Sequence, residues 1–192
     1  MTATTAASAA TREARFRAVY EACYPDLLRF VQRRVHPSHA EDVVAEVFLV
    51  AWRRLEELPE ADGARCWLFG VARHSLLNSQ RGQVRRTALA VRIATAPTAA
   101  QLDDTDLVDR RLDLAAAWPR LSATDQEALA LTVWDGLTAT EAAAVLQISA
   151  VAFRLRLSRA RRALRRHLDQ PDDTAPVGAR RPPSTNDGRS TR

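Results

Sequence analysis

The sequence predicts an all-α protein made of two small helical domains joined by a flexible linker, the second of them containing a helix-turn-helix. Three observations lead to this prediction. Apolar residues recur at helical spacing in several segments, and no segment shows the alternation typical of a β-strand. The helical pattern lapses around Pro97, where Ala, Thr and acidic residues replace it. Beyond that break, a short helical segment, a tight turn and a long basic segment follow one another.

The chain divides into five parts on this basis. Residues 1–11 are small and polar, and residues 169–192 mix Pro, Asp, Gly, Ser and Arg without periodicity, so we expect both ends to be disordered. The first domain is expected over residues 12–86, the linker over 87–106 and the second domain over 107–168. Helices are predicted over residues 12–35, 39–58, 63–84, 107–118, 122–135, 138–146 and 150–168.

The second predicted helix begins with a hydroxyl cap and carries two carboxylates. Ser38 precedes Glu41 by three residues, which is the spacing of a capping box. The expected buried stripe of this helix consists of Val43, Val47, Val50 and Leu55. Asp42 and Glu46 lie one turn apart, but no further His or acid is placed to complete a catalytic or metal site. We therefore expect this face to dock against a helix of another protein.

The third predicted helix is basic and interleaved with aromatic residues. Six arginines and no acidic residue occur between residues 65 and 92. Aromatic rings that stack on bases, together with arginines that contact phosphates, are typical of a surface that binds single-stranded nucleic acid. Asn78 lies one turn beyond His74 on the same face and is the preferred candidate for a base contact. Trp67 and its apolar neighbours also fit an ordinary helical core.

The helices of the second domain have clear start and stop signals. Ser122 precedes Asp125 by three residues, and Thr138 precedes Glu141 by three, so each pair predicts an N-cap. Gly136 lies just after the expected end of the preceding helix, where a left-handed backbone conformation is common. These signals define the short first helix of the helix-turn-helix.

The last predicted helix, residues 150–168, carries seven arginines and no acid, and Ser149 is placed to cap it. Its apolar stripe packs on protein, so the opposite face is expected to enter the major groove of DNA. The expected DNA contacts are Arg154, Leu155, Arg156, Ser158, Arg159 and Arg162. Leu155, apolar on the outer face, is expected to meet a thymine methyl, and the arginines guanine or phosphate. A solvated arginine-rich helix that ends a bundle is the alternative.

The composition narrows the function classes. The chain has 192 residues and a net charge of +5, and all 28 basic residues are arginine, which is also typical of a G+C-rich coding sequence. Cys23 and Cys66 form neither a disulfide framework nor a zinc motif. No apolar run reaches the length of a membrane span. We expect a cytoplasmic protein with no membrane insertion and no catalytic site, metal or cofactor.

Several blocks of the sequence resemble a known family. They are FRAVYEACYPDLLRFVQRRV, AEDVVAEVFLVAWRRL and WLFGVARHSLLNSQRGQVRR in the first domain, and LSATDQEALALTVWDGLTATEAAAVLQIS followed by RLRLSRARRAL in the second. In this order they resemble the bacterial RNA polymerase sigma factors of the sigma-70 family. The resemblance is to the small extracytoplasmic-function (ECF) group, which keeps only regions 2 and 4. It covers about residues 12–86 and 108–168.

The resemblance implies a transcription initiation factor rather than an enzyme. Its first domain would bind the coiled coil of the polymerase β′ subunit through Asp42, Glu46 and Leu49. The −10 promoter element would be bound by Arg73, His74, Asn78, Arg81, Arg85 and Arg86. Asn78 would line a pocket for a base flipped out of the non-template strand. The second domain would dock on the β flap and read the −35 element as duplex, and the group implies an anti-sigma factor as a further partner.

The chain departs from the family pattern at three places. Ala45 stands where a glutamine is usual, His74 where an asparagine is common, and Ala152-Phe153 where Thr-Val is frequent. Two other classes of protein remain open from the residues alone. A stand-alone helix-turn-helix regulator would bind duplex DNA without polymerase, and an enzyme acting on nucleic acid would use the carboxylates and polar groups of the first domain.

Overall fold

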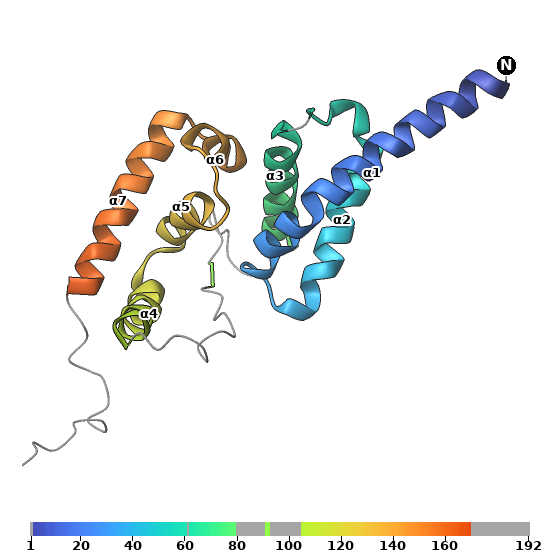
Figure 1. The fold of residues 1–192 in the computed structure, drawn as a ribbon. Coiled ribbons are helices and arrows are strands. Elements are labelled where there is room, and N and C mark those ends of the chain that lie inside the picture. Colours follow the sequence, from blue (N-terminus) through green and yellow to red (C-terminus); the bar gives the residue numbers. More distant parts are fainter. Residues whose placement is uncertain (1, 61, 80–90, 93–104, 170–192) are drawn as a thin grey trace, which may run out of the picture.

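The computed structural model describes residues 2–60, 62–79, 91–92 and 105–169 (Figure 1). Within these ranges the chain forms helices and no strand, which confirms the all-α class. The α-helices are α1 (Thr2–Gln32), α2 (Ala40–Arg53), α3 (Asp62–Ser79), α4 (Thr105–Ala117), α5 (Ala123–Val133), α6 (Ala139–Leu146) and α7 (Ala150–Asp169). Short 3-10 turns are η1 (Pro37–His39), η2 (Leu55–Glu57) and η4 (Trp118–Arg120). Most of the predicted linker and tail lie outside the described residues.

The first domain consists of α1, α2 and α3, which pack on one another. Figure 1 shows the N-terminal turns of α1 extending past the other two helices. Phe30 of α1 and Phe69 of α3 stack with ring centroids 4.4 Å apart, and both are fully buried. Burial of a side chain of this size contributes about 1.5–3 kcal/mol, so such residues fix how the three helices pack.

In the second domain, α4, α5 and α6 all contact α7. The buried residues of α7 are Phe153, Leu157 and Ala160. The apolar spacing continues to Leu164 and Leu168, but Leu164 is half-buried and Leu168 is exposed. Trp118 and Trp134 lie with their ring centroids 4.8 Å apart. The basic face of α7 is therefore turned away from the domain core.

The predicted helix starts of this domain are confirmed. Side-chain oxygens accept backbone N–H groups at Ser122 before α5, Thr138 before α6 and Ser149 before α7. At α6 the capping box is complete, because the Glu141 carboxylate also accepts the backbone N–H of Thr138 at 2.8 Å. Gly136 has the predicted positive φ, 65°.

Helix α1 begins earlier than the sequence pattern predicts. Residues 1–11 are predicted to be disordered, but α1 starts at Thr2, so this prediction is wrong for residues 2–11. The segment is rich in alanine, the residue with the highest helix propensity. It also continues a helix that is already fixed by packing of its later turns, and extending a helix costs far less than nucleating one.

The start and the buried face of α2 also differ from prediction. Ser38 does not cap α2; its own N–H donates to Nδ1 of His36 at 3.4 Å, within the turn η1. The buried residues of α2 are Ala40, Val44, Val47, Phe48 and Ala51. Of the four predicted residues, Val47 and Leu55 are buried, whereas Val43 and Val50 are only half-buried. The stripe is shifted because α2 contacts both α1 and α3.

The two domains are docked on each other. Helix α6 packs against α3, and Figure 1 shows the two side by side. Buried apolar side chains of both domains form one continuous cluster. None of the helices described is long and apolar enough to cross a membrane.

Candidate nucleic-acid interface

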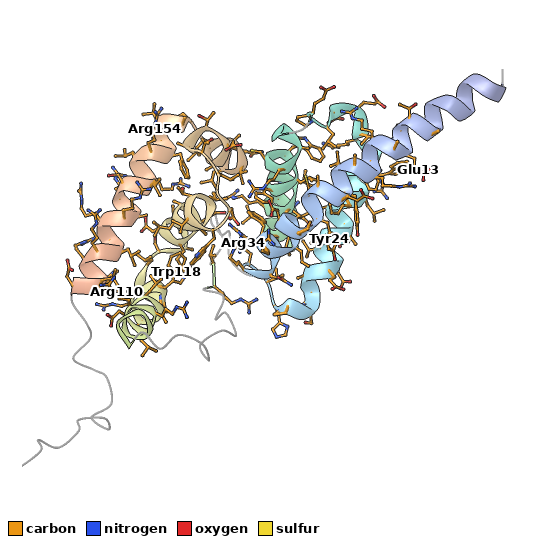
Figure 2. The ribbon with its side chains drawn as sticks, in the orientation of Figure 1. Glu13, Tyr24, Arg34, Arg110, Trp118 and Arg154 are labelled. Atoms are coloured by element: carbon orange, nitrogen blue, oxygen red, sulfur yellow. The ribbon has the colours of Figure 1, made fainter. Side chains whose placement is uncertain are left out.

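Helix α7 presents a polar and basic face to solvent. Arg154, Ser158, Arg159 and Arg162 are exposed, and Arg156 is half-buried. Leu155 is 52% exposed although it is apolar. Figure 2 shows Arg154 near the N-terminal end of the helix, the end that enters the major groove in helix-turn-helix proteins. All six predicted −35 contacts therefore keep at least part of their surface open to solvent.

The tight turn predicted before α7 is present, and it contains a left-handed residue that the sequence does not indicate. Gln147 has φ 56°, a left-handed conformation, and its N–H bonds to carbonyl oxygens of α6. The N–H of Ile148 donates to the carbonyl of Ala143 at 3.0 Å, which closes the end of α6. A glycine at this position would have revealed the turn, but glutamine gives no such signal.

The predicted −10 residues that the structure describes lie on one stretch of α3. His74 is exposed, and Arg73 and Asn78 are half-buried. His74 and Asn78 line a groove of about 950 Å³ between α3 and α6, together with Cys66 and Trp67. Arg81, Arg85 and Arg86 lie outside the described residues. His74 and Asn78 thus lie in one groove, as their helical spacing predicts, whereas Arg73 is not part of its lining.

Arg73 is engaged by the second domain. Its Nε donates to Oε1 of Glu127 at 2.7 Å and its Nη2 to Oε2 at 3.3 Å. Glu127 lies on α5 and is fully buried. The Arg73 guanidinium, which the sequence assigns to a DNA phosphate, is therefore paired with a carboxylate of the second domain.

The three predicted polymerase contacts lie on an exposed face of α2. Asp42, Glu46 and Leu49 are all exposed, and Leu49 shows 54% of its surface. The hydroxyl of Ser75 on α3 donates to Oε2 of Glu46 at 3.2 Å. An acidic and apolar face of this kind fits a docking surface for a helix.

Sequence reasoning placed Trp52 beside this face but missed the α1 side of an aromatic cluster there. Tyr20 of α1 and Trp52 of α2 are 40% and 38% exposed. Phe16, also on α1, packs against α2, with its ring centroid 5.1 Å from that of Trp52. The signal in the sequence is the spacing of Phe16, Tyr20 and Tyr24, which places three rings on one helix face.

A buried ion-pair cluster joins the domains. The Asp135 carboxylate accepts from Nη2 of Arg34 at 3.0 Å and also from Arg33. Figure 2 shows Arg34 at the boundary of the two domains. Burial lowers the pKa of the Arg34 guanidinium, and the nearby Asp135 carboxylate opposes this shift. Because the partners lie 101 positions apart, no local pattern in the sequence predicts the pair.

Two family models match the chain: Sigma-70 region 2 over residues 19–86, and Sigma-70, region 4 over residues 111–164. The chain is 31% identical over 166 residues to the ECF RNA polymerase sigma factor SigL of Mycobacterium tuberculosis, a match that covers 85% of this chain and 94% of SigL. It is 32% identical over 160 residues to SigC of the same species, covering 81% of this chain and 84% of SigC.

Solved structures agree with these matches. The sigma factor RpoE in complex with the anti-sigma factor NepR, from Bartonella quintana, has a TM-score of 0.59 and 25% identity, covering 82% of this chain and 98% of RpoE. CnrH in complex with the cytosolic domain of CnrY has a TM-score of 0.55 and 26% identity. The match covers 82% of this chain and 89% of CnrH. The two family models fall on the two helical domains described above, so the chain belongs to the ECF group of the sigma-70 family, the RNA polymerase sigma factors that act in transcription initiation.

Proposed function

We propose that this sigma factor binds core polymerase through α2, holds the melted −10 element on α3 and reads the −35 element as duplex with α7. The observation that carries this proposal is the presence of two polar surfaces of different character on one chain. One is an exposed basic recognition helix, and the other is a groove lined by polar and aromatic groups.

The chemistry of α7 suits the edges of paired bases. Arg154, Arg156, Arg159 and Arg162 carry planar guanidinium groups that donate two hydrogen bonds to guanine or contact phosphate, and Ser158 bonds either. Leu155 supplies an apolar contact for a thymine methyl group. Because base edges carry the sequence information, these residues set the −35 preference.

The chemistry of α3 suits unpaired bases. Asn78 carries both a donor and an acceptor for the edge of a flipped base, and His74 lies one turn away. Unstacking a base costs a few kcal/mol, which phosphate contacts from Arg73, Arg81, Arg85 and Arg86 would offset. The first domain therefore favours the melted state of the −10 element.

The partners follow from the surfaces and from the relatives. Asp42, Glu46 and Leu49 would contact the β′ coiled coil, and the second domain would contact the β flap. RpoE and CnrH were each solved with a partner, NepR and CnrY. By analogy we propose an anti-sigma factor for this chain, a location in the cytoplasm and no catalytic activity of its own.

Gel shifts on genomic promoter fragments, with and without core polymerase, test this function. We expect strong and specific binding only when core is present, because core aligns the two domains on DNA. The Asp42→Ala, Glu46→Ala double variant should lose core association and the shift with it. The Glu13→Ala, Glu21→Ala double variant, which removes two exposed acids of α1, is the matched control. Specific binding by the chain alone would favour the stand-alone regulator instead.

A further inference from the structure

The arginines of α7 differ from those of the first domain in what they contact within the chain. Arg34 and Arg73 of the first domain are paired with buried carboxylates of the second domain. No arginine of α7 forms an ion pair with any residue that the structure describes. Figure 1 shows α7 on the side of the second domain that is turned away from the first. The charge of this helix is therefore available to an anion outside the chain.

Helix α7 is longer than the base-contacting part that the proposed function gives it. It contains 20 residues, which corresponds to a length of about 30 Å. The proposed −35 contacts, from Arg154 to Arg162, occupy about 12 Å of this length, which is also about the width of the major groove. A straight helix leaves the groove beyond this point, because the groove winds around the duplex. The last two turns of α7 therefore lie over the sugar–phosphate backbone.

Two arginines of these last turns continue the DNA-facing side of the helix. Arg166 follows Arg162 by four residues, and Arg165 follows Ser158 by seven, so each lies on the same face as a proposed −35 contact. Both side chains are exposed. Arg161 is also exposed, but it is rotated by about 100° from Arg162 around the helix axis. The proposed DNA surface thus extends through Arg165 and Arg166 to the C-terminal end of α7.

The chemistry of this end of the helix fits phosphate. A guanidinium group donates two parallel hydrogen bonds to phosphate oxygens, and its positive charge strengthens both. Asp169, the last residue of α7, is the only acid of the helix, and it forms no ion pair with either arginine in the described chain. Because this surface is continuous with the one assigned to duplex DNA, the anion that fits it best is the DNA backbone.

We infer that Arg165 and Arg166 bind backbone phosphates of the duplex beside the −35 element and supply affinity without sequence preference. The position beside the −35 element rests on the proposed function of α7. Phosphate contacts carry no sequence information, so this end of the helix strengthens binding to every promoter alike. It also makes binding more sensitive to salt, because each phosphate that is neutralised releases counterions.

A purely structural role for these arginines predicts a different result. Cations in the last turn of a helix offset the partial negative charge at its C-terminal end and so stabilise the helix. That role affects the unfolding temperature but not the way in which DNA binding depends on salt. The salt dependence of DNA binding therefore separates a phosphate contact from a contribution to helix stability.

The test measures binding of the full-length chain alone to a fluorescent duplex without promoter elements, by anisotropy over a series of low salt concentrations. The Arg165→Gln, Arg166→Gln double variant should lower the slope of log affinity against log salt by about two, since each phosphate contact contributes about 0.9. The Arg165→Lys, Arg166→Lys variant keeps both charges and should keep most of the slope. The Arg17→Gln, Arg29→Gln variant removes two exposed arginines that are paired with acids of α1 itself, and it should leave the slope unchanged.

Three results contradict the inference. The slope could fall by the same amount in the α7 variant with glutamines and in the α1 control, which would show a general effect of charge. The α7 variant could melt earlier with an unchanged slope, which would assign the two arginines to helix stability. It could lose association with core polymerase at an unchanged slope, which would assign the surface to a protein partner.

A second measurement locates the contact on promoter DNA. In complex with core polymerase, the wild type should protect backbone positions beside the −35 element from hydroxyl radicals. The Arg165→Gln, Arg166→Gln variant should lose that protection and keep the same promoter preference. An unchanged footprint overturns the inference. If the wild type forms no promoter-specific complex with core, the proposed function fails instead, while the salt slopes still decide whether these arginines bind phosphate.

Discussion

Leu155 is the apolar side chain most directly assigned to base recognition. It is 52% exposed on a helix whose core face is already filled by Phe153 and Leu157. We expect Leu155→Ala to weaken preference for thymine at one −35 position, with a cost of about 1 kcal/mol, the lower end for a mismatched base pair. Transcription from a promoter library randomised over the −35 element measures this change.

Leu168→Ala is the matched control for Leu155→Ala. Leu168 lies on the same helix, is 38% exposed and is remote from the N-terminal turns. It should leave the promoter preference unchanged. If Leu155→Ala also leaves the −35 preference unchanged, Leu155 does not contact a thymine methyl group.

The Thr138–Glu141 capping box makes the stability of α6 dependent on pH. Hydrogen bonds from the hydroxyl and backbone N–H of Thr138 lower the pKa of Glu141 below its ordinary value of 4.5. Because the folded pKa is depressed, this contribution is present above the ordinary pKa and is lost as the pH falls through the folded value. Thr138→Ala should cost about 1 kcal/mol at pH 7 by urea unfolding.

Glu141→Gln removes the charge of Glu141 but keeps a side chain that can cap the helix. Glutamine completes a capping box without titrating. The difference in unfolding free energy between wild type and this variant should therefore shrink as the pH falls below 4.5. A difference that is the same at every pH would show that Glu141 does not titrate with folding.

The helices of the second domain show which local features a sequence reveals. Ser122, Thr138 and Ser149 could be identified as caps because each bonds to a backbone group within three residues. The left-handed turn at Gln147 could not, because it is imposed by the packing of α6 against α7 rather than by its own side chain. The early start of α1 was missed for a similar reason, since helix there continues from packed turns downstream.

The two left-handed positions that flank α6 predict opposite effects of substitution. Gln147→Gly should stabilise the domain by about 0.5–1 kcal/mol, because glycine adopts positive φ without the cost that other residues incur. Gly136→Ala should destabilise it by about 1 kcal/mol for the converse reason, although there is space for the added methyl group. Thermal unfolding of both variants measures the signs, and a Gln147→Gly protein that melts earlier than wild type contradicts this explanation.

The arrangement of the whole molecule was only partly predictable. Helical spacing revealed two domains, the basic faces of α3 and α7 and the acidic face of α2. The docking of the domains was not foreseen, because Arg34 and Asp135 are 101 positions apart and Arg73 and Glu127 are 54 apart. Arginines that look like phosphate ligands in the sequence are thus partly occupied by acids of the same chain. The charge pattern of the sequence predicted the basic surfaces, but the fold determines which of their arginines are unpaired and can contact DNA.

Transcription by core polymerase with this chain on a genomic DNA library, followed by mapping of the RNA 5′ ends, tests the central claim most directly. The account predicts start sites that appear only when the chain is added and that share two sequence elements at a fixed spacing upstream. If the chain fails to bind core, or if core with the chain starts no transcripts beyond those of core alone, the account is contradicted.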